Sequence, residues 1–511
     1  MIRIKNIKVK TKNQLKKELI KILNNNEFEY KIVKESIDAR HNKLFYIYTV
    51  DAEIDNEDKY LSNNIIKTPN EEYIVNITGT KKLNYRPIII GSGPAGLFLA
   101  YMLSLYGYKP IIYERGEDID ARVKAVEEFW KNGNLNPNTN IQFGLGGAGT
   151  FSDGKLNTLV KDKNNRCKKV FEIFKDNGAL ENIMYEKNPH IGTDILRIVV
   201  KNMKEKIIEN GGEFHFNSLV TDINVTDKIN SIIVNNEVIK TDILFLAIGH
   251  SARDTFYMLN RKGINMENKP FAVGLRIEHP RTMINKSQYN DPNINASYKL
   301  TYNTKNRGIY TFCMCPGGYV VNASSENERL VINGMSNNKR DSLNSNSAIV
   351  VTVNELDYGT NLFDGVKFQE KLESIAYRLG NGKIPVQLFI DYKNNKMSNS
   401  FGEYEPCIKG NYTFSNLNEL FNNDINNSLK EAIINFGTKI NGFDRDDAIL
   451  SGVESRTSSP IRIIRDDNYE TNIKGIYPIG EGAGYAGGIT TSAMDALKVF
   501  EIIISKYKPF K

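Results

Sequence analysis

Three glycines in one short segment have the spacing of a phosphate-binding turn. Residues 87–96 read Pro-Ile-Ile-Ile-Gly-Ser-Gly-Pro-Ala-Gly, an apolar strand that runs into Gly-x-Gly-x-x-Gly and then a helix-forming stretch. In such a turn the first glycine makes the bend, the second lets the backbone approach a pyrophosphate, and the third lets helix pack on strand. An acid about 20 residues further on accepts a ribose hydroxyl. The sequence therefore predicts a dinucleotide site at Gly91, Gly93, Pro94, Ala95, Gly96 and Glu114.

Two kinds of side chain could move protons or electrons beside such a site. His250 follows an apolar strand, 241–249, and the ordinary pKa of histidine suits proton transfer near neutral pH. The alternative is a structural histidine bonded to Asp254 or to the backbone. Cys313 and Cys315 form a Cys-x-Cys pair, and a redox dithiol is the rival hypothesis for catalysis. A disulfide across one residue is strained and therefore oxidising, so a pocket wall with both thiols on one face of a strand is the simpler interpretation.

The C-terminal segment indicates which nucleotide binds. Residues 473–499 contain an apolar strand, an acidic glycine-rich turn and a helix. This resembles the closing motif of the two-domain flavoproteins, in which the acid binds a ribityl hydroxyl and the next helix N-terminus faces the flavin. A helix N-terminus favours negative charge and so an anionic, reduced ring. The strand 241–249 resembles the flavoprotein strand that returns beneath the cofactor. These resemblances add Gly249, Gly480, Glu481 as the ribityl ligand, Gly488, Ile489 and Thr490 to the predicted site.

A further resemblance covers nearly the whole chain. It rests on Glu-Arg-Gly at 114–116 and on segments 142–156, 189–194, 249–254, 312–319 and 453–462. These are similar to segments of the bacterial FAD-dependent dehydrogenases usually described as uncharacterised NAD(P)/FAD-dependent oxidoreductases. The resemblance implies a two-domain glutathione-reductase-type FAD fold and a dehydrogenase or reductase activity, but no particular substrate. FAD is expected to be non-covalent, because no histidine or cysteine lies in a flavin-linkage motif.

A second glycine run, at 144–149, also fits Gly-x-Gly-x-x-Gly and could indicate a separate domain for a nicotinamide nucleotide. The residues before it are too polar for a buried parallel strand, and those after it do not start a helix. We therefore expect a loop against the flavin, with Lys155 nearby, and NAD(P)H as a co-substrate would have to dock transiently over the ring. The loop residues assigned to the cofactor are Gly146, Gly147, Gly149 and Thr150.

Arginines could bind anionic groups at two places. Arg115 and Arg122 follow the second strand, and by resemblance to flavin hydroxylases Arg122 contacts the pyrophosphate, since a guanidinium fits phosphate bidentately. The alternative is a surface helix on which Arg122 pairs with Asp118. Later arginines could converge on a substrate carboxylate or phosphate, with ion pairs to Glu278, Asp341 or Glu454 as the alternative. The substrate-binding candidates are Arg276, Arg340, Arg456 and Arg462.

Composition narrows the class of protein. The chain has 511 residues, 40% of them apolar and 25% charged, which is ordinary for a globular enzyme. No signal peptide or membrane span is predicted, and four cysteines make no disulfide framework, so a reducing cytoplasm is expected. No metal site is predicted, because ligand spacing is lacking. His190, before a predicted helix start, is a weaker candidate than His250, and three further histidines are expected to be structural: His41, His215 and His279.

The net charge of +7 suits an anionic cofactor, and lysines are dense over residues 3–44. A small-molecule substrate, with a redox partner left open, is favoured over nucleic acid. The alternative class is an FAD-dependent protein that modifies or binds nucleic acid such as tRNA through this basic N-terminal region.

The predicted fold is α/β, with a discontinuous Rossmann-type FAD-binding domain. Residues 1–82 form a small N-terminal α/β module, and residues 83–255 form the first part of the FAD-binding domain, with an excursion at about 157–190. Residues 256–464 form an inserted, mainly antiparallel substrate domain of short strands. Residues 465–511 complete the FAD-binding domain.

Overall fold

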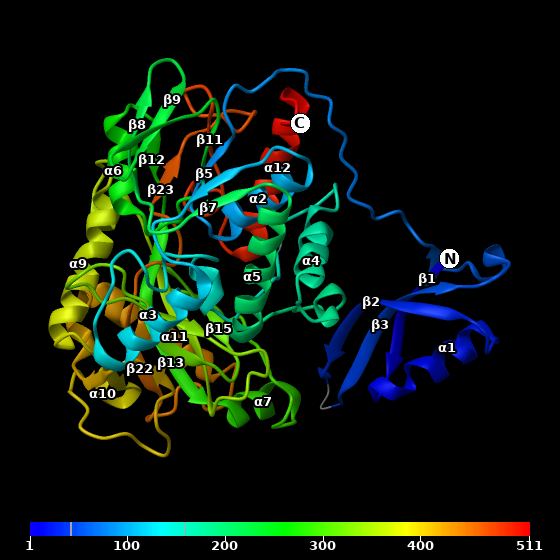
Figure 1. Cartoon of the computed structure of the whole chain (residues 1–511). Coiled ribbons are helices and arrows are strands. Elements are labelled where there is room, and N and C mark those ends of the chain that lie inside the picture. The colour runs from blue at the N-terminus through cyan, green and yellow to red at the C-terminus, as the bar shows by residue number, and fades with distance from the viewer. Residues whose placement is uncertain (41–42, 159, 511) are drawn as a thin grey trace.

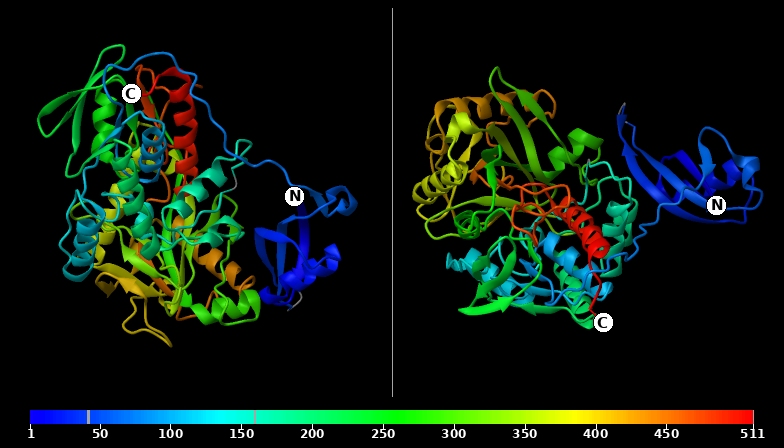
Figure 2. Two further views of the ribbon diagram at one scale, coloured as in Figure 1. Left: turned by 45° about the vertical axis from the view of Figure 1, so that its right-hand side comes forward. Right: turned by 90° about the horizontal axis from the view of Figure 1, so that it is seen from above.

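The computed structural model describes residues 1–40, 43–158 and 160–510, which fold as a mixed α/β protein. A small N-terminal module stands to one side of a larger body (Figures 1 and 2). The module is an antiparallel sheet of order β2-β3-β1-β4, with β1 (Ile2–Val9), β2 (Glu29–Asp38), β3 (Phe45–Glu53) and β4 (Ile65–Lys67). The 3₁₀ turn η1 (Lys12–Gln14) leads into α1 (Leu15–Leu23), which buries Leu15, Leu19 and Leu23 at helical spacing against the sheet.

An extended segment joins this module to the body. After the 3₁₀ turn η3 (Glu57–Tyr60) and β4, the chain runs along the C-terminal helix α12 (Ile489–Lys506). The Gly79 amide donates to the Ile504 carbonyl at 2.9 Å, and the Tyr73 hydroxyl donates to Glu501 at 3.0 Å. Residues 73–81 therefore pack on the body, whereas the sequence assigned them to the N-terminal module.

A five-stranded parallel sheet forms one half of the body. Its order is β24-β11-β5-β6-β7, with β5 (Ile88–Ile90), β6 (Ile111–Tyr113), β7 (Glu213–His215), β11 (Leu244–Leu246) and β24 (Ile476–Pro478). Strands β5 and β11 are apolar throughout because both faces are buried: Ile89 packs into one hydrophobic cluster while Ile88 and Ile90 pack into another. The edge strand β7 is partly exposed. Four strands from the first half of the chain and one from its end thus share a sheet.

Helices cover one face of the parallel sheet and an antiparallel ribbon covers the other. On the first face lie α2 (Pro94–Leu105), α4 (Arg166–Asp176), α5 (Thr193–Glu209) and α12, whose apolar side chains share one cluster (Figure 1). On the second face lie β8 (Val220–Val225), β9 (Ile229–Val234), β10 (Glu237–Lys240) and α6 (Arg253–Arg261). Helix α3 (Ile119–Asn132) and the 3₁₀ turns η4 (Ala148–Phe151) and η5 (Glu181–Met184) lie in the connections.

A seven-stranded sheet forms the other half of the body, in the order β14-β15-β18-β13-β22-β19-β21. Its strands are β13 (Phe271–Pro280), β14 (Thr301–Asn303), β15 (Gly308–Cys315), β18 (Asn344–Val353), β19 (Ile384–Leu388), β21 (Tyr412–Phe414) and β22 (Ile449–Glu454). Every neighbouring pair is antiparallel except β19 with β21. Two strands, β13 and β18, pair over ten residues and are longer than the short strands expected for this region.

The remaining elements pack around this sheet. Three short strands form one further sheet and two form another: β16 (Tyr319–Asn322), β17 (Ile332–Met335) and β20 (Ile408–Lys409), then β12 (Met266–Asn268) and β23 (Ile461–Ile463). The helices are α7 (Arg281–Tyr289), α8 (Glu355–Tyr358), α9 (Asp364–Leu379), α10 (Phe389–Lys393) and α11 (Asn423–Gly437), with the 3₁₀ turn η6 (Leu417–Glu419). In the part of the chain that the structure describes, no helix has the length and apolarity needed to cross a bilayer.

Candidate functional site

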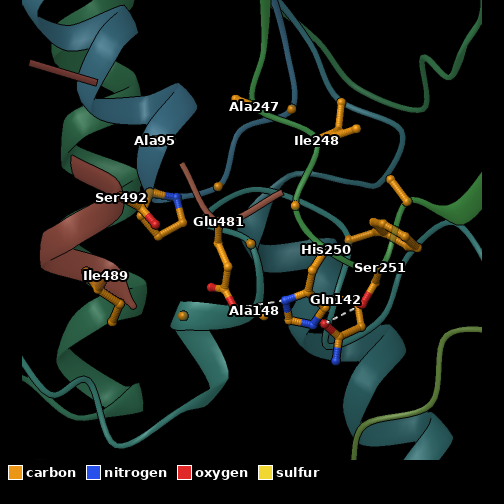
Figure 3. Close-up of a pocket in the computed structure, with 18 of the residues that line it drawn as sticks. Ala95, Gln142, Ala148, Ala247, Ile248, His250, Ser251, Glu481, Ile489 and Ser492 are labelled. Atoms are coloured by element: carbon orange, nitrogen blue, oxygen red, sulfur yellow. Dashed lines mark hydrogen bonds and ion pairs between the residues drawn. The ribbon is translucent and has the colours of Figure 1, made fainter. Parts of the chain in front are cut away.

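A cavity of about 370 Å³ lies where the two halves of the body meet. Segments far apart in the sequence line it: the turn after β5, the turn after β11, and the turn between β24 and α12 (Figure 3). The carboxyl ends of parallel strands lie at one edge of a sheet, and ligands of such sheets bind beyond that edge. The wall opposite is formed by Phe312, Cys313, Asn333 and Glu454 from the antiparallel half.

The first glycine turn has the geometry that its spacing predicts. Gly91 has φ +95°, and a Cβ there would lie 2.5 Å from the Ala247 carbonyl oxygen, so only glycine fits. A Cβ at Gly96 would collide with the Gly91 carbonyl. Gly93 differs, because the only protein atom near its Cβ position is the Gly147 Cα at 3.8 Å. The protein therefore has room for a side chain at Gly93, and that room opens into the cavity.

Two helix N-termini open into this cavity without a capping side chain. Gly93 is the N-cap of α2 and Gly488 is the N-cap of α12, and neither cap makes a side-chain hydrogen bond. Uncapped N–H groups and the helix dipole attract anions. Pro94, Ala95, Ile489 and Thr490 line the cavity beside them. Gly480 does not line it; a Cβ there would lie 2.7 Å from the Ala95 Cβ, so this glycine lets the last strand approach α2.

Glu114 lines the cavity and also accepts hydrogen bonds from backbone amides of the protein. Its carboxylate accepts from the Ser92 amide at 2.8 Å, the Ser92 hydroxyl at 2.7 Å, and the Gly116 and Gly144 amides at 2.9 Å each. These four donors occupy the usual lone-pair sites of a carboxylate. The carboxylate lines the cavity, yet its first effect is to hold the two glycine loops together.

Arg122 does not reach the cavity, so the predicted pyrophosphate contact was wrong. The side chain is fully buried beneath the second glycine loop and donates to carbonyl oxygens of Asn140, Ile141, Gly144, Leu145 and Gly147. Burial lowers its pKa to about 9. The alternative pairing with Asp118 is also absent, because that carboxylate binds Lys204. A guanidinium matches a loop of converging carbonyls as well as it matches a phosphate.

The second glycine loop lies against the first. A Cβ at Gly147 would lie 2.8 Å from the Gly93 Cα, and one at Gly149 would lie 3.0 Å from an Ile489 side-chain carbon. Both glycines line the cavity, whereas Gly146 and Thr150 face a small apolar space of about 20 Å³ behind it. Arg115 lines the cavity, where it pairs with Asp254 at 2.8 Å.

His250 and Glu481 face each other in the cavity (Figure 3). The His250 Nδ1 lies 2.9 Å from the Glu481 Oε1, so the acid predicted to bind a ribityl hydroxyl holds a histidine in this structure. The alternative partner Asp254 binds Arg115 instead. The His250 Nε2 is buried and has no hydrogen-bond partner within the described ranges. Gly249, at φ +72°, turns the chain so that the imidazole lines the cavity.

The two thiols differ in exposure. Cys313 lines the cavity and Cys315 is fully buried, so only the outer thiol contributes to the predicted pocket wall. Strand β15 pairs with β18 from Ile309 to Phe312, and the register then shifts before Cys315. The shift interrupts the two-residue alternation at Cys313. Within the described residues both cysteines are free thiols.

The four candidate substrate arginines do not converge. Arg276 is fully buried and donates to Glu454 at 3.0 Å; Arg340 pairs with Asp153 at 2.6 Å. Arg462 pairs with Glu267 at 3.0 Å, away from the others. Of these four arginines only Arg456 lines the cavity, and its guanidinium forms an ion pair with Glu373. The predicted anion pocket of four arginines was therefore wrong, because each guanidinium meets a carboxylate from a distant part of the chain.

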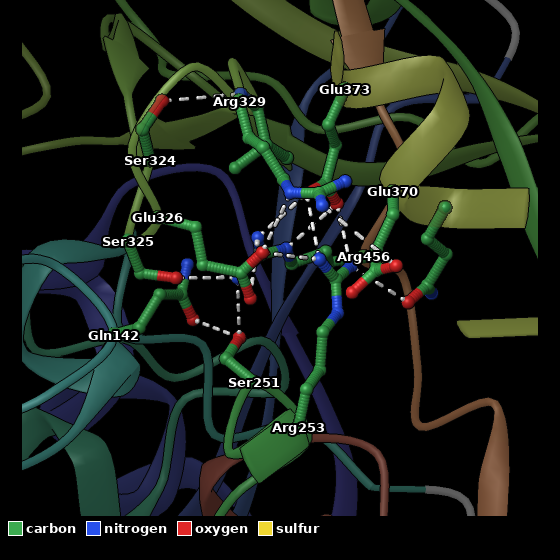
Figure 4. Close-up of polar contacts among 12 residues, drawn as sticks. Gln142, Ser251, Arg253, Ser324, Ser325, Glu326, Arg329, Glu370, Glu373 and Arg456 are labelled. Atoms are coloured by element: carbon green, nitrogen blue, oxygen red, sulfur yellow. Dashed lines mark hydrogen bonds and ion pairs between the residues drawn. The ribbon is translucent and has the colours of Figure 1, made fainter. Parts of the chain in front are cut away.

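A buried ion network supports the cavity from behind (Figure 4). Arg253 and Arg456 both donate to the Glu373 carboxylate, at 2.8 and 2.7 Å, and Arg456 also donates to Ser251 at 3.0 Å. Burial alone would raise the pKa of Glu373, but the two guanidiniums outweigh it and hold that pKa well below its usual range. The network links the segment after His250 to α9 and to the end of β22.

Several of these residues had no sequence signal. Glu454 was considered only as an ion-pair partner, and it ends β22 at the cavity, where burial raises its pKa to about 7 despite Arg276. Gln142 was part of a quoted motif; it accepts from the Ser251 hydroxyl at 3.1 Å. Glu373 lies on an unremarkable helical segment. These residues contact partners that are far away in the sequence, and such contacts cannot be inferred from the spacing of residues along the chain.

None of the other histidines that the structure describes lines the cavity. His190 bonds the Asn338 carbonyl through Nε2 at 2.9 Å, and His279 bonds the Phe443 carbonyl at 2.7 Å, where burial lowers its pKa to about 4. His215 stacks on Tyr113, and His41 lies outside the described residues. No group of three potential metal-ligating side chains occurs in the described part of the chain.

Comparisons with known proteins identify relatives of this chain. A family model described as "FAD-dependent protein, C-terminal domain-like" matches residues 270–457, and a domain of unknown function matches residues 1–53. An uncharacterized protein of Clostridium beijerinckii is 47% identical over 529 residues, covering 99% of each chain. Among solved structures, glycine oxidase from Geobacillus kaustophilus aligns at a TM-score of 0.36 and 10% identity, over 84% of this chain and 97% of that one. CtdE in complex with FAD aligns at 0.32 and 12%, over 82% of each. Scores this low carry no argument.

Proposed function

This chain belongs to one family with the Clostridium beijerinckii protein and carries an FAD-dependent C-terminal-type domain, and on that premise we propose that it is an FAD-dependent oxidoreductase. One FAD binds non-covalently in the cavity, and the enzyme passes hydride between a small molecule and the flavin. The parallel sheet and its helices, from residues 83–255 and 465–511, act as a Rossmann-type FAD-binding domain. Residues 256–464 act as the substrate domain.

The observation that carries this proposal is the meeting of two uncapped helix N-termini in one glycine-lined cavity. A dinucleotide needs donors and a positive potential at its diphosphate, together with backbone that can be approached closely. Gly93 supplies that approach, because nothing in the protein itself excludes a side chain there. The His250 Nε2 and the Lys155 Nζ are buried at the cavity without a hydrogen-bond partner in the described chain, so each has capacity for a bound group.

The flavin supplies hydride transfer when bound, so the protein must orient the substrate and move protons. Glu481 orients the imidazole of His250 through Nδ1, which leaves Nε2 free to exchange a proton with a substrate in the cavity. Lys155, whose Nζ lies 3.3 Å from Asp153, brings positive charge to the same space. Phe312 from the antiparallel half adds an aromatic ring to the cavity wall.

An anaerobic half-reaction tests this proposal. Purified holoprotein is mixed with NADH or NADPH without oxygen, flavin absorbance is followed, and small-molecule acceptors are then screened for reoxidation. We expect reduction by a nicotinamide or another small donor, followed by reoxidation by a particular acceptor. A protein that retains FAD but exchanges electrons with no small molecule, and that instead binds tRNA with a steep salt dependence, would contradict the proposal and favour the nucleic-acid alternative.

A further inference from the structure

The backbone at Cys313 is held in a conformation that a cysteine rarely adopts. Its φ is +44°, in the left-handed region that residues other than glycine, asparagine and aspartate rarely adopt. The strain coincides with the register shift between Phe312 and Cys315 in β15. Bulges of this kind re-aim a side chain, and strained residues persist where the surrounding structure holds them, often at functional sites. Here the result is a thiol that lines the cavity, with the buried Cys315 two residues further along the same strand.

The surroundings of the two thiols differ in a way that favours charge on the outer one. The Cys315 Sγ donates to the Cys313 carbonyl oxygen at 3.3 Å, so the Cys315 side chain lies beside Cys313. The neighbouring Cys315 side chain and the positive charges of Arg276 and Lys155 lower the pKa of the Cys313 thiol, although burial opposes this. Arg276 also donates to the Cys313 carbonyl at 3.1 Å. The neighbouring Cys313 side chain and burial raise the pKa of Cys315. The pair is therefore a thiolate at the cavity and a protonated thiol behind it, the arrangement that nucleophilic cysteines need.

A proton donor lies on the same wall. Glu454 lines the cavity, accepts from the Arg276 Nε at 3.0 Å, and has its pKa raised by burial to about 7, so near neutral pH the protonated and ionised forms are both populated. A leaving thiolate needs a proton from such a group. Lys155 lowers the pKa of the Cys313 thiol, and the negative charge of Asp153, which also lines the cavity, partly opposes this by raising that pKa.

We propose that Cys313 is a nucleophilic thiolate, that Cys315 is its resolving thiol, and that the substrate class of this cavity is a small disulfide. The inference rests on the proposed function in that it names the substrate class of the same site. It adds a chemical step that no flavin needs to perform.

The step is two thiol–disulfide exchanges. The Cys313 thiolate attacks one sulfur of a disulfide R–S–S–R, forming a Cys313–S–S–R bond, and the leaving RS⁻ takes a proton from Glu454 or water. The Cys315 thiol then attacks the Cys313 sulfur and passes its proton to the leaving sulfur, which releases the second thiol RSH and forms the Cys313–Cys315 disulfide. The disulfide substrate is reduced to two thiols, and the cysteine pair is oxidised by the same two electrons. A disulfide across one residue is strained and oxidising, so the second exchange requires the disulfide substrate in excess.

Alkylation tests the nucleophile in the unmodified holoprotein. The chain is treated with limiting iodoacetamide between pH 5.5 and 8.5, and the rate at each cysteine is measured by peptide mass spectrometry. Cys167 is the internal control, since burial raises its pKa to about 11. We expect Cys313 to react at least about tenfold faster than Cys167 at pH 6.5, because the thiolate is the reacting form. Equal rates at these two cysteines would overturn the inference.

A disulfide probe tests the resolving thiol. Holoprotein is incubated with 2-hydroxyethyl disulfide, and intact masses are measured for wild type, Cys313→Ser, Cys315→Ser and Cys315→Ala. Wild type should lose two hydrogens and release two thiols. The Cys315 variants should stop at a mixed disulfide on Cys313, and Cys313→Ser should form neither product. A stable mixed disulfide on wild type, or closure without Cys315, would contradict the pairing.

The two proposals fail separately. FAD is released from each sample by denaturation and quantified alongside the thiol measurements. Protein that carries FAD but shows no selective reaction at Cys313 overturns only the dithiol inference. Protein that never binds FAD overturns the proposed function, whereas the alkylation result still decides the chemistry of Cys313.

Discussion

The two walls of the cavity are built by different means. On the parallel-sheet side, backbone does the positioning: glycines at φ +95° and +72° and two helix N-termini shape the space. On the antiparallel side, side chains do it: Arg276 reaches Glu454 across neighbouring strands, and a register shift turns Cys313 toward the cavity. The first wall suits a ligand with a constant shape, such as a dinucleotide. The second holds the titratable groups that would determine the substrate.

The largest effect on FAD binding should come from Gly93→Val. Its φ of −71° is open to any residue, and the only protein atom within 4 Å of a Cβ is the Gly147 Cα at 3.8 Å, so the fold should tolerate the change. The cofactor should not, because the branched side chain would occupy the place of a phosphate. We expect FAD affinity, measured by titration of the apoprotein, to fall by about 100-fold or more, roughly 2.7 kcal/mol.

Gly308→Val is the matched control, at a glycine of β15 with no atom closer than 3.5 Å. The apoproteins of both variants should have unfolding temperatures close to that of wild type. Retained FAD affinity in Gly93→Val would show that the parallel-sheet wall does not bind the diphosphate.

Arg122→Met tests whether backbone positioning depends on a buried cation. Five carbonyl oxygens lose their donor, and each buried acceptor left without a partner costs about 1–3 kcal/mol. We expect the free energy of unfolding, from urea titration of the apoprotein, to fall by at least about 3 kcal/mol. Lys124→Met, on the exposed side of the same helix, should change it little. Unchanged stability combined with lost FAD would restore the direct phosphate contact inferred from sequence.

His250→Gln tests the proton-transfer role at the boundary between the walls. The variant should retain FAD and its spectrum, because no backbone changes, while the substrate half-reaction slows by about 10²–10⁴-fold, the usual range for a lost general acid or base. Stopped-flow measurement of flavin reoxidation gives this rate. His215→Gln is the control, since His215 does not itself line the cavity and only stacks on Tyr113. Normal turnover in His250→Gln with no activity in Cys313→Ser would assign the chemistry to sulfur alone.

A smaller, pH-dependent effect is expected in the antiparallel half. Burial raises the pKa of Glu278 to about 7, against about 4.3 for an unfolded glutamate, and its Oε1 lacks a partner among the described residues. A carboxyl whose native pKa is raised stabilises the fold below the unfolded pKa, and that contribution is lost as pH rises through 7. The stability of Glu278→Gln relative to wild type should therefore rise by about 2–3 kcal/mol when the pH is raised from 5 to 8.

Urea titrations of both proteins at the two pH values measure this difference. The exposed Glu431→Gln on α11 is the control and should show no such gain. If the difference in free energy of unfolding between Glu278→Gln and wild type were the same at pH 5 and pH 8, Glu278 would not be neutral in the native protein at pH 5.

The smallest effect on FAD should come from removing the N-terminal module. A chain that begins at Asn70 keeps the segment that packs on α12, and we expect it to bind FAD with wild-type affinity. A chain that begins at Leu83 loses Tyr73 and Val75 from the hydrophobic cluster and should be less stable. Equal stability of the two chains would show that this segment belongs with the module after all. If only the full chain is retained on tRNA, the module would be a nucleic-acid surface.

The sequence predicted the parallel-sheet wall well and the other wall poorly, for a physical reason. Glycine spacing is a local signal of backbone shape, so the turns at Gly91 and Gly249 could be placed from a few neighbouring residues. The partners of Arg276, Arg340 and Arg456 could not, because each guanidinium meets a carboxylate from a strand or helix far along the chain. Arg122 and the Cys313 bulge show the same limit: residue type was informative, but direction was set by tertiary packing.

The central claim is that the glycine-lined cavity holds one non-covalent FAD, and its stoichiometry is the most direct test. Purified protein is saturated with FAD, freed of excess, and denatured, and the released flavin is counted against protein concentration. The account predicts about one FAD per chain, all of it released by denaturation, and none retained by Gly93→Val. Wild-type protein that binds no FAD, or flavin that stays attached after denaturation, would contradict it.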